Sequence, residues 1–326
     1  MTMEFQSYQA IKDWKDQHIS KKQTDTYSLN TFHDVIMKNV FKLALKLLDM
    51  GAPPCPFSWF ITGSGGRFEQ GLISDQDHGI VYERNDDIAN EFFKALGEEI
   101  SFGLNIVGYP YCEGNVMSSN SKWRKPLELW KIQLFDWMDE GSFKNIRNLQ
   151  IFFDARLLIG DEILLNSLKN VIFKYRTEHP ALIRRLMENV SHVKNAIGPL
   201  GQIIVEEKGI HAGAVDLKYA AFLPYVNAIR LLAIKDGISH TSTLDRLNQL
   251  MNLNGNYYEV LSGCKNNFLR LLELRLTLFN QSDSYDDIHY LKINKLTREE
   301  KKELKQILKE GKKLHQYVNA IIEKGC

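Results

Sequence analysis

The sequence predicts an α+β protein in which a small mixed-sheet domain lies between an N-terminal helical segment and a C-terminal helical bundle. Two short apolar runs with strand character, SWFIT and HGIVYE, stand close together in residues 58–83, whereas apolar residues at helical spacing dominate both sides. The composition, 44% hydrophobic and 25% charged over 326 residues, suits a globular chain of two or three compact units. We place the domains at residues 1–52, 53–165 and 166–326.

The N-terminal segment reads as helices followed by a linker. VIMKNVFKLALKLLDM carries apolar residues at helical spacing and is followed by Gly51, a residue type that commonly ends helices. The three prolines of GAPPCP can neither continue a helix nor serve a central strand. We therefore expect a new unit to begin near Phe57.

The middle domain is expected to contain four strands and several helices. The strands are SWFIT, HGIVYE, LNIVGYPYCEGNVM and LQIFFDA, with GSGG as a tight turn after the first and RFEQGL as the start of a short helix. The longer helices are RNDDIANEFFKALGEEISFG, opened by Asp86 and Asp87 as the helix dipole prefers, LELWKIQLFDWMDEG and RLLIGDEILLNSLKNVIFKYR.

From about residue 178 onward the pattern predicts helices alone. DLKYAAFLPYVNAIRLLAIKDG contains Pro224, which predicts a kink. The final segment, LTREEKKELKQILKEGKKLHQYVNAIIEK, alternates the sign of its charges and therefore reads as a solvated amphipathic helix, not as a nucleic-acid tail.

The charge and cysteine content exclude several classes of protein. Lys and Arg total 41 against 40 Asp and Glu, so no overall field favours nucleic acid or an anionic membrane. The four cysteines include no CxxC pair, which argues against a zinc site and a disulfide framework and favours the reducing cytoplasm. No apolar stretch approaches the roughly 20 residues of a membrane span, and the first residues are too polar for a signal peptide.

Two carboxylates, Asp75 and Asp77, interrupt what otherwise reads as a buried strand. Side chains two residues apart on a strand point to the same face, and two like charges this close are unfavourable without a positive partner. A hard divalent cation such as Mg²⁺ or Mn²⁺ is that partner, because it takes carboxylate oxygens and completes its shell with water and substrate phosphates. The pair therefore predicts a metal site.

The turn formed by Gly63, Ser64, Gly65 and Gly66 complements this pair. Its backbone amides and the Ser64 hydroxyl suit phosphate oxygens, and Arg67 adds a guanidinium. The turn is no Walker A loop, since no Gly-Lys-Ser/Thr follows, and the Asp pair is no EF-hand loop, since Ile80 stands where that loop needs Gly. Either feature alone is commonly structural, but together they describe a metal and triphosphate site.

GSGGRFEQGLISDQDHGIVY resembles the signature of the nucleotidyltransferase superfamily with the DNA polymerase beta fold. More narrowly, Gly-Ser-x-Gly-Arg-x-Glu-Gln followed by Ser-Asp-Gln-Asp resembles the bacterial signal-transduction nucleotidyltransferases, which are similar to the PII protein uridylyltransferase. GNVMSSNSKWRKPLELW, FFDARLLIGD and DLKYAAFLPYVNAIRLLAIKDGI resemble downstream segments of that family. The chain departs from many relatives in showing no obvious CBS pair and in carrying His78 where they often have Asn.

The resemblance implies that residues 53–165 are the catalytic domain, that residues 166–326 are a substrate-binding-like domain, and that a third carboxylate joins Asp75 and Asp77. Asp154 is the favoured candidate for catalysis and metal binding, with Glu113 as the alternative. A helix N-cap or an ion pair with Arg156 is the structural alternative for Asp154. Further nucleotide-binding candidates are Trp123, which is otherwise a core residue, Arg124 and Lys218.

These features predict a magnesium-dependent transfer of a nucleoside monophosphate from a nucleoside triphosphate to an acceptor hydroxyl. By resemblance the acceptor is a protein, as for PII, which is modified on a Tyr hydroxyl. The alternatives are a non-catalytic nucleotide sensor with the same fold and a helical interaction protein whose Asp pair is structural. Template-directed polymerisation is disfavoured, because a near-neutral chain without basic stripes offers a duplex little to bind.

Overall fold

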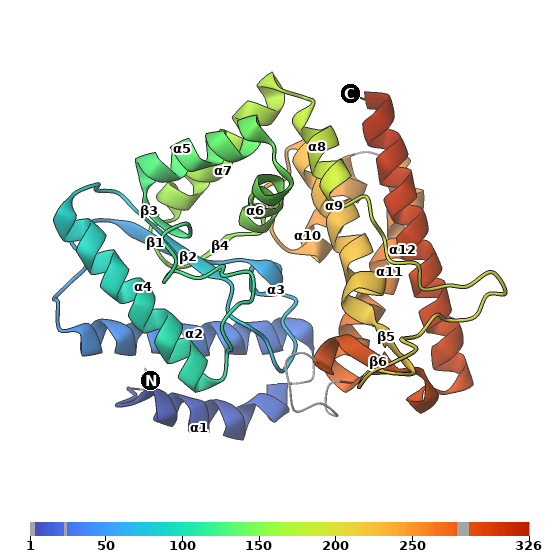
Figure 1. Ribbon diagram of the computed structural model, residues 1–326, viewed down its shortest axis with the longest axis horizontal. Helices are drawn as coiled ribbons and strands as arrows, with labels where there is room; N and C mark the ends of the chain where they lie inside the picture. The colour runs from blue at the N-terminus through green and yellow to red at the C-terminus, as the bar shows by residue number, and fades with distance from the viewer. Residues whose placement is uncertain (1–3, 23–24, 254, 279–286, 326) are drawn as a thin grey trace. The chain divides into compact units, whose positions relative to one another are not determined.

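The computed structural model describes residues 4–22, 25–253, 255–278 and 287–325. The chain divides into two compact units, Met1–Tyr175 and Arg176–Cys326 (Figure 1). The first unit contains a four-stranded mixed sheet surrounded by helices, and the second is largely helical. The predicted α+β class is therefore confirmed.

The first unit begins with two helices. Its elements are α1 (Tyr8–His18), η1 (Ile19–Lys22), α2 (Thr26–Leu48), β1 (Phe57–Ile61), α3 (Gly63–Gly66), β2 (His78–Tyr82), α4 (Asp87–Val107), β3 (Arg124–Pro126), α5 (Leu127–Glu140), α6 (Phe143–Phe153), β4 (Arg156–Gly160) and α7 (Glu162–Glu178). The helix α1 packs on the helices α2 and α4, and α2 packs on α4 and on the sheet. The strand order is β3-β2-β1-β4. β1 runs antiparallel to both β2 and β4, whereas β3 is parallel to β2.

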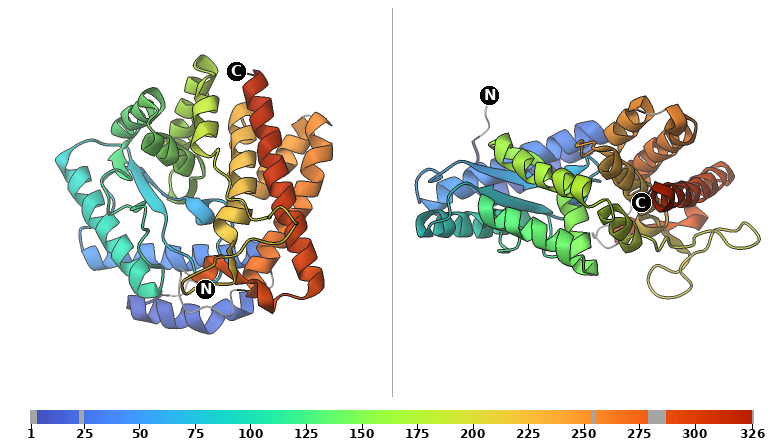
Figure 2. Two further views of the ribbon diagram at one scale, coloured as in Figure 1. Left: turned by 45° about the vertical axis from the view of Figure 1, so that its right-hand side comes forward. Right: turned by 90° about the horizontal axis from the view of Figure 1, so that it is seen from above.

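The central strand β1 explains how helices come to cover both faces of the sheet. Successive strand residues point to opposite faces. Trp59 stacks on Phe41 of α2, with ring centroids 5.1 Å apart, whereas Phe60 meets Phe152 of α6 edge to face at 5.6 Å. Both strand residues are fully buried. The three views show α2 and α4 on one side of the strands and α5 and α6 on the other (Figures 1 and 2).

The third strand of the sheet differs from the one expected. LNIVGYPYCEGNVM contains no such strand: its first residues complete α4, which ends at Val107 with Gly108 in the left-handed conformation as its cap. The third strand is instead β3. The apolar pattern of α4 continues into LNIV. A short apolar run at the end of a helix resembles the start of a strand, and for this reason the predicted third strand is wrong.

The fourth strand is displaced by a few residues for the same reason. LQIFF lies in α6, whose N-cap Ser142 accepts a hydrogen bond from Asn145 N, and the strand is RLLIG, which had been assigned to a helix. RFEQGL also forms no helix, since α3 is a single turn confined to Gly63–Gly66. By contrast, Asp86 caps α4 as predicted and α5 covers the expected segment.

The second unit contains a helical bundle and a small two-stranded antiparallel sheet, whose strands are far apart in the sequence. Its elements are α8 (Leu182–Asn189), β5 (Ala214–Asp216), the π-helix η2 (Lys218–Phe222), α9 (Leu223–Asp236), α10 (Thr243–Leu253), α11 (Gly255–Leu278), η4 (Asp287–His289), β6 (Tyr290–Lys292), η5 (Ile293–Lys295) and α12 (Arg298–Gly325). The antiparallel pair β5–β6 corrects the expectation of helices alone. Three-residue strands are too short to show the alternation by which strands are recognised.

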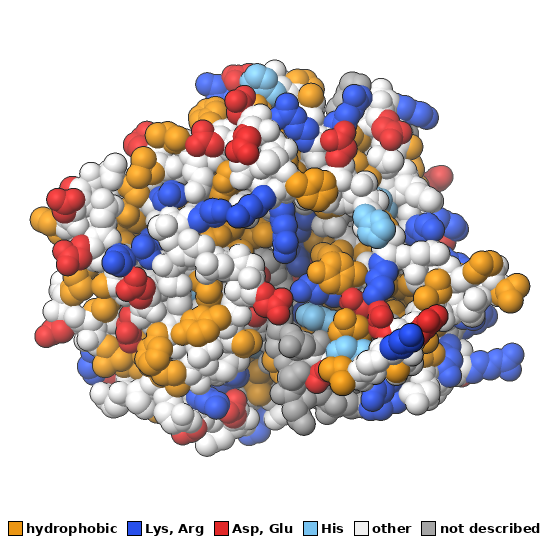
Figure 3. All heavy atoms as spheres, in the orientation of Figure 1, with side chains coloured by type: hydrophobic (Ala, Val, Ile, Leu, Met, Phe, Trp, Pro, Cys, Tyr) orange, Lys and Arg blue, Asp and Glu red, His pale blue; other side chains and the backbone are white. Residues whose placement is uncertain are grey.

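Pro224 stands where the chain passes from the π-helix η2 directly into α9. The change of helix type gives the proline, which has no amide hydrogen, a place in the first turn of α9. The kink expected at Pro224 stays a prediction. None of the helices in the described ranges is long and apolar enough to cross a membrane. Cationic and anionic side chains are interspersed over the face shown in Figure 3, as their near-equal numbers predict.

Two helix-interior glycines form a matched test of the packing of α4. A Cβ on Gly97 would lie 2.3 Å from the Ser118 carbonyl oxygen, whereas a Cβ on Gly263 of α11 would meet no atom within 4 Å. We expect Gly97→Ala to lower the free energy of unfolding by about 1–3 kcal/mol because the backbone must shift. Gly263→Ala should instead raise it by up to about 1 kcal/mol. Urea denaturation of both variants checks this, and equal midpoints would contradict it.

Candidate functional site

The Asp75–Asp77 segment lies directly before β2, not within it. Gln76 forms an isolated parallel bridge with Tyr111, and the Asp77 carbonyl accepts a 2.9 Å hydrogen bond from Thr62 N at the end of β1. The segment is thus aligned on both sides by backbone hydrogen bonds, although it is outside the regular strand. Both aspartates remain half-buried, whereas the intervening Gln76 is fully buried.

The two carboxylates share their site with a thiol. One oxygen each of Asp75 and Asp77 and the sulphur of Cys112 all lie within 4.8 Å of one another. Burial raises the pKa of the Cys112 thiol, and the charge of Asp77 and a hydrogen bond to it raise that pKa further. The sequence does not point to Cys112, because no spacing between cysteines involves it and 34 residues lie between it and Asp77.

The glycine turn lies against the carboxylate pair. Gly63 adopts φ 56°, and a Cβ there would stand 2.1 Å from Asp77 Oδ2. On the other side of the turn, a Cβ on Gly66 would stand 2.0 Å from the Asp154 carbonyl oxygen. Glycine is therefore required at both positions, because any side chain would displace either the Asp77 carboxylate or the backbone before β4. The structure thus brings the predicted turn and the predicted Asp77 into contact.

Arg67, the residue after the turn, joins a buried ion network. Its Nε donates to Glu69 at 2.7 Å and its Nη1 to Asp154 Oδ2 at 2.7 Å. Burial lowers the pKa of Arg67, but the charges and hydrogen bonds of these two carboxylates outweigh that effect, so the pKa is raised overall. The guanidinium thus ties the glycine turn to the segment between α6 and β4.

The surroundings of Asp154 match neither of its two structural alternatives, a helix N-cap and an ion pair with Arg156. It is the C-cap residue of α6, not an N-cap, and its ion pair is with Arg67, not with Arg156. Its side chain is fully buried. In the part of the chain that the structure describes, the cluster of potential metal ligands is formed by Asp75, Asp77 and Cys112. A metal-binding role for Asp154 stays a prediction, as does that of Glu113, which is exposed in the loop after Cys112.

A buried histidine holds the residue between the two aspartates. His78 Nδ1 accepts a 3.2 Å hydrogen bond from Trp59 Nε1, and His78 Nε2 lies 2.9 Å from Gln76 Oε1. Gln76 Nε2 donates to the Tyr109 and Ser101 carbonyls at 3.0 and 3.1 Å. Burial lowers the pKa of His78 to about 3, so the ring is neutral, with its proton on Nε2 for donation to Gln76. The pair thereby fixes the backbone that carries both carboxylates.

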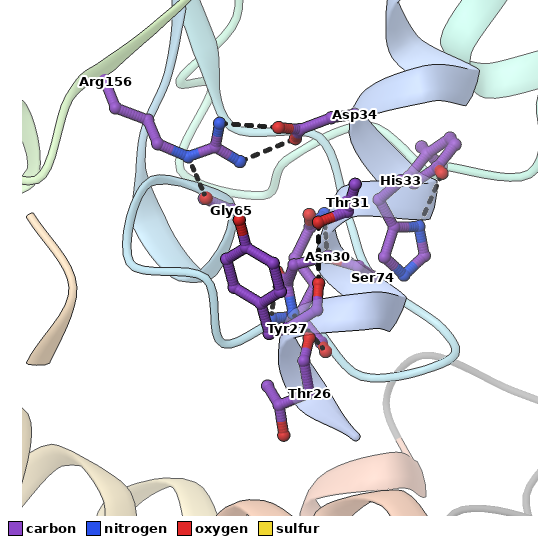
Figure 4. Close-up of polar contacts among 11 residues, drawn as sticks. Thr26, Tyr27, Asn30, Thr31, His33, Asp34, Gly65, Ser74 and Arg156 are labelled. Atoms are coloured by element: carbon purple, nitrogen blue, oxygen red, sulfur yellow. Dashed lines mark hydrogen bonds and ion pairs between the residues drawn. The ribbon is translucent and has the colours of Figure 1, made fainter. Parts of the chain in front are cut away.

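The N-terminal helix α2 holds the loop that connects the turn to Asp75. Asn30 Oδ1 accepts from Gln70 N at 3.0 Å, and Asn30 Nδ2 donates to Gln70 O at 3.3 Å. One turn further, His33 Nε2 lies 2.9 Å from the Gly71 carbonyl oxygen. Figure 4 shows these α2 side chains directed at the loop. The first helices therefore help to position the site in addition to covering the sheet.

Arg156 at the start of β4 links α2 to the glycine turn (Figure 4). Its two terminal nitrogens bind the Asp34 carboxylate at 2.8 and 2.6 Å, and its Nε donates to the Gly65 carbonyl oxygen at 3.0 Å. The guanidinium also lies over the Phe68 ring, 3.8 Å from its centroid. Bidentate pairing of this kind fixes orientation as well as charge, so α2 and β4 together hold the turn in place.

The remaining predicted site residues lie in different surroundings. Ser64 is half-buried within α3. Trp123 is 1% exposed and packs edge to face on Trp130, whereas Arg124 of β3 donates from Nη1 to the Ser118 and Ser119 carbonyls. Lys218 begins η2 in the second unit. Nucleotide binding by these residues stays a prediction.

A glycine turn that follows β1 and contacts an Asp-x-Asp pair before the antiparallel strand β2 is the arrangement that the resemblance to nucleotidyltransferases implies. Comparison with protein families gives two consecutive matches. Residues 10–144 match the family described as "Putative nucleotidyltransferase DUF294", and residues 180–322 match its "Putative nucleotidyltransferase substrate binding domain". The chain belongs to this nucleotidyltransferase family and carries its substrate-binding domain. A comparison with curated proteins gave no match.

The residues present fit the divalent metal that such chemistry uses. Two carboxylates and a thiol offer donor atoms within reach of a single ion. The absence of a side chain at Gly63 leaves Asp77 Oδ2 accessible from the turn. Carboxylate oxygens are the donors that Mg²⁺ and Mn²⁺ take, with water and phosphate oxygens completing the shell.

Two conservative carboxylate-to-amide changes separate structural from metal-binding roles. Asp154→Asn removes the charge that a fully buried ion pair requires, and we expect it to lower the free energy of unfolding by about 3 kcal/mol. Asp75→Asn relieves repulsion between neighbouring carboxylates and should cost far less, because like charges disfavour each other's ionised form. Chemical denaturation without added metal compares the two. A larger loss for Asp75→Asn would contradict the assignment.

Proposed function

We propose that the protein transfers a nucleoside monophosphate from a nucleoside triphosphate to an acceptor hydroxyl in a magnesium-dependent reaction. The observation that carries the proposal is the contact between the glycine turn and the Asp77 carboxylate, in a chain that belongs to a nucleotidyltransferase family. The first amides of a helical turn have no partner within the helix and suit phosphate oxygens. The paired carboxylates beside the turn suit the ion that accompanies a triphosphate.

In this proposal Asp75 and Asp77 hold the metal. The turn Gly63–Gly66 orients the outer phosphates through the Ser64 hydroxyl and the amides of its first residues, since the Gly66 amide donates to the Thr62 carbonyl oxygen. A bound Mg²⁺ supplies charge neutralisation and in-line orientation at the reacting phosphate. The acceptor oxygen forms a bond to the alpha phosphorus, the bond from that phosphorus to the bridging oxygen breaks, and pyrophosphate leaves. The acceptor proton passes to a nearby carboxylate or water. No enzyme nucleophile is needed, since positioning supplies most of the catalysis.

The second unit supports a separate acceptor. Its match to a substrate-binding domain covers nearly all of its helices. The resemblance of GSGGRFEQGLISDQD to the uridylyltransferase signature favours a hydroxyl on a regulatory protein, and a Tyr hydroxyl above others. In this proposal the first unit carries out the transfer and the second recognises the acceptor.

One observation favours a second candidate function, a nucleotide sensor. The favoured third carboxylate, Asp154, is engaged with Arg67 in a fully buried ion pair. A site with only two carboxylates would bind a metal–nucleotide complex and lack the group that activates the acceptor. The sensor and the enzyme differ in turnover, not in nucleotide binding.

The test is transfer of label from alpha-labelled ATP, UTP, GTP and CTP into a host-cell lysate, with Mg²⁺ or Mn²⁺. Wild type is compared with Asp75→Ala/Asp77→Ala and with a matched control, Glu83→Ala/Asp87→Ala, which removes two exposed carboxylates outside the site. We expect label in a discrete protein band with wild type and the control, and a loss of at least about 100-fold in the site variant, since metal ligation contributes several kcal/mol.

Other outcomes discriminate between the candidates. Label in a small molecule would keep the chemistry and reject a protein acceptor. Metal-dependent nucleotide binding without transfer, absent from Asp75→Ala/Asp77→Ala, would favour the sensor. Equal transfer by the site variant and wild type would remove Asp75 and Asp77 from the mechanism.

A further inference from the structure

Cys112 is held beside the carboxylate pair by backbone hydrogen bonds at both ends of its loop. Gln76 N donates to the Pro110 carbonyl oxygen at 3.2 Å, and His78 N donates to the Val116 carbonyl oxygen at 3.0 Å. The loop 110–116 therefore flanks the segment that carries the two aspartates. Its position does not depend on the thiol, so the sulphur is presented to the site by the backbone.

The loop closes on itself at Cys112. Asn115 N donates to the Cys112 carbonyl oxygen at 2.9 Å, and Asn115 adopts φ 54°, a left-handed conformation that Asn tolerates in turns. A Cβ on Gly114 would lie 3.5 Å from the Cys112 sulphur, an ordinary contact distance. The turn thus fixes the backbone of the residue whose sulphur lies beside the aspartates.

The sulphur of Cys112 lies beside two carboxylates that can bind the same metal ion. The Asp77 carboxylate lies next to it, and the Val116 carbonyl oxygen, at the end of the same loop, accepts from His78 N. With Asp75 and Asp77 the sulphur belongs to a three-donor group within 4.8 Å. Donor atoms on one tetrahedral zinc ion, with bonds of about 2.0 to 2.3 Å, lie roughly 3.3 to 3.8 Å apart. Movements of about 1 Å or less would therefore bring all three donors onto one ion.

Building on the metal site of the proposed function, we propose that Cys112 Sγ is a third protein donor to the ion held by Asp75 and Asp77. The site then prefers a borderline cation, Zn²⁺ above all, over Mg²⁺. Thiolate ligands select Zn²⁺, whereas an all-carboxylate set suits Mg²⁺ and Mn²⁺. As the metal–sulphur bond forms, the thiol proton leaves to solvent, so binding releases one proton. Zn²⁺ would occupy the position that Mg²⁺ needs and would compete with it.

The test follows metal binding directly and does not depend on turnover. The full-length reduced protein is titrated with Cd²⁺, whose thiolate bond gives an ultraviolet charge-transfer band, and then with Zn²⁺ in competition. Cys112→Ser removes only the sulphur, Asp77→Asn removes a carboxylate and keeps the thiol, and Cys55→Ser is the matched control, because Cys55 is the other half-buried cysteine in the described residues. Circular dichroism shows whether each variant is folded.

In wild type and in Cys55→Ser we expect the Cd²⁺–thiolate band to reach its full intensity at one Cd²⁺ per chain. In folded Cys112→Ser we expect no such band. Asp77→Asn should keep the band with weaker affinity. Removing a residue that only hydrogen-bonds a metal ligand typically lowers metal affinity by about 10- to 100-fold. Because Cys112→Ser removes the ligand itself, the loss of Zn²⁺ affinity should be at least about that large. Mg²⁺ affinity should change little. A band that survives in Cys112→Ser, or Cd²⁺ binding to wild type without a band, overturns the inference.

The two proposals fail separately. A Cys112-dependent band without nucleotidyl transfer would leave the metal ligand in place and reject the enzyme. Nucleotidyl transfer by a wild-type protein that shows no thiolate band would keep the enzyme and reject Cys112 as a ligand.

Discussion

The repulsion between two neighbouring carboxylates is the constraint on which the first unit depends. Asp75 and Asp77 are kept together by the backbone on either side: Thr62 and the loop 110–116 hydrogen-bond the segment that bears them. Buried side chains then hold Gln76, the residue between them. In the proposed function this scaffold would hold the two carboxylates in place before the cation binds, so that binding requires less reorganisation.

The glycine turn is fixed by a second set of charges that is separate from the carboxylate pair. Arg67 donates to the carboxylates of Glu69 and Asp154. Arg156 donates to the Asp34 carboxylate and to the Gly65 carbonyl oxygen. Buried pairs of this kind contribute less to stability than to a unique arrangement, as their desolvation offsets much of the attraction. Here the two guanidiniums hold the four-residue helix α3 against α2 and against the segment that leads into β4.

The fold class, the glycine turn and the Asp pair could be predicted because each has a local signal. GSGG and SDQD are short patterns whose residue types follow from the chemistry of phosphate and metal. LQIFF and LNIV were assigned to strands wrongly, because a short apolar run in a helix and one in a strand look alike without their partners. Cys112 could not be found, since its place beside Asp77 results from tertiary pairing of Gln76 with Pro110, which leaves no spacing in the sequence.

His78 has a consequence for how the pH dependence of any activity is interpreted. Histidine is the side chain usually held responsible for a rate that falls below neutral pH. Here the ring accepts from Trp59, donates to Gln76 and has a pKa of about 3, so it stays neutral across the physiological range. An acid limb near pH 6.5 would therefore report the nucleotide, the metal or the acceptor, and not the histidine next to the aspartates.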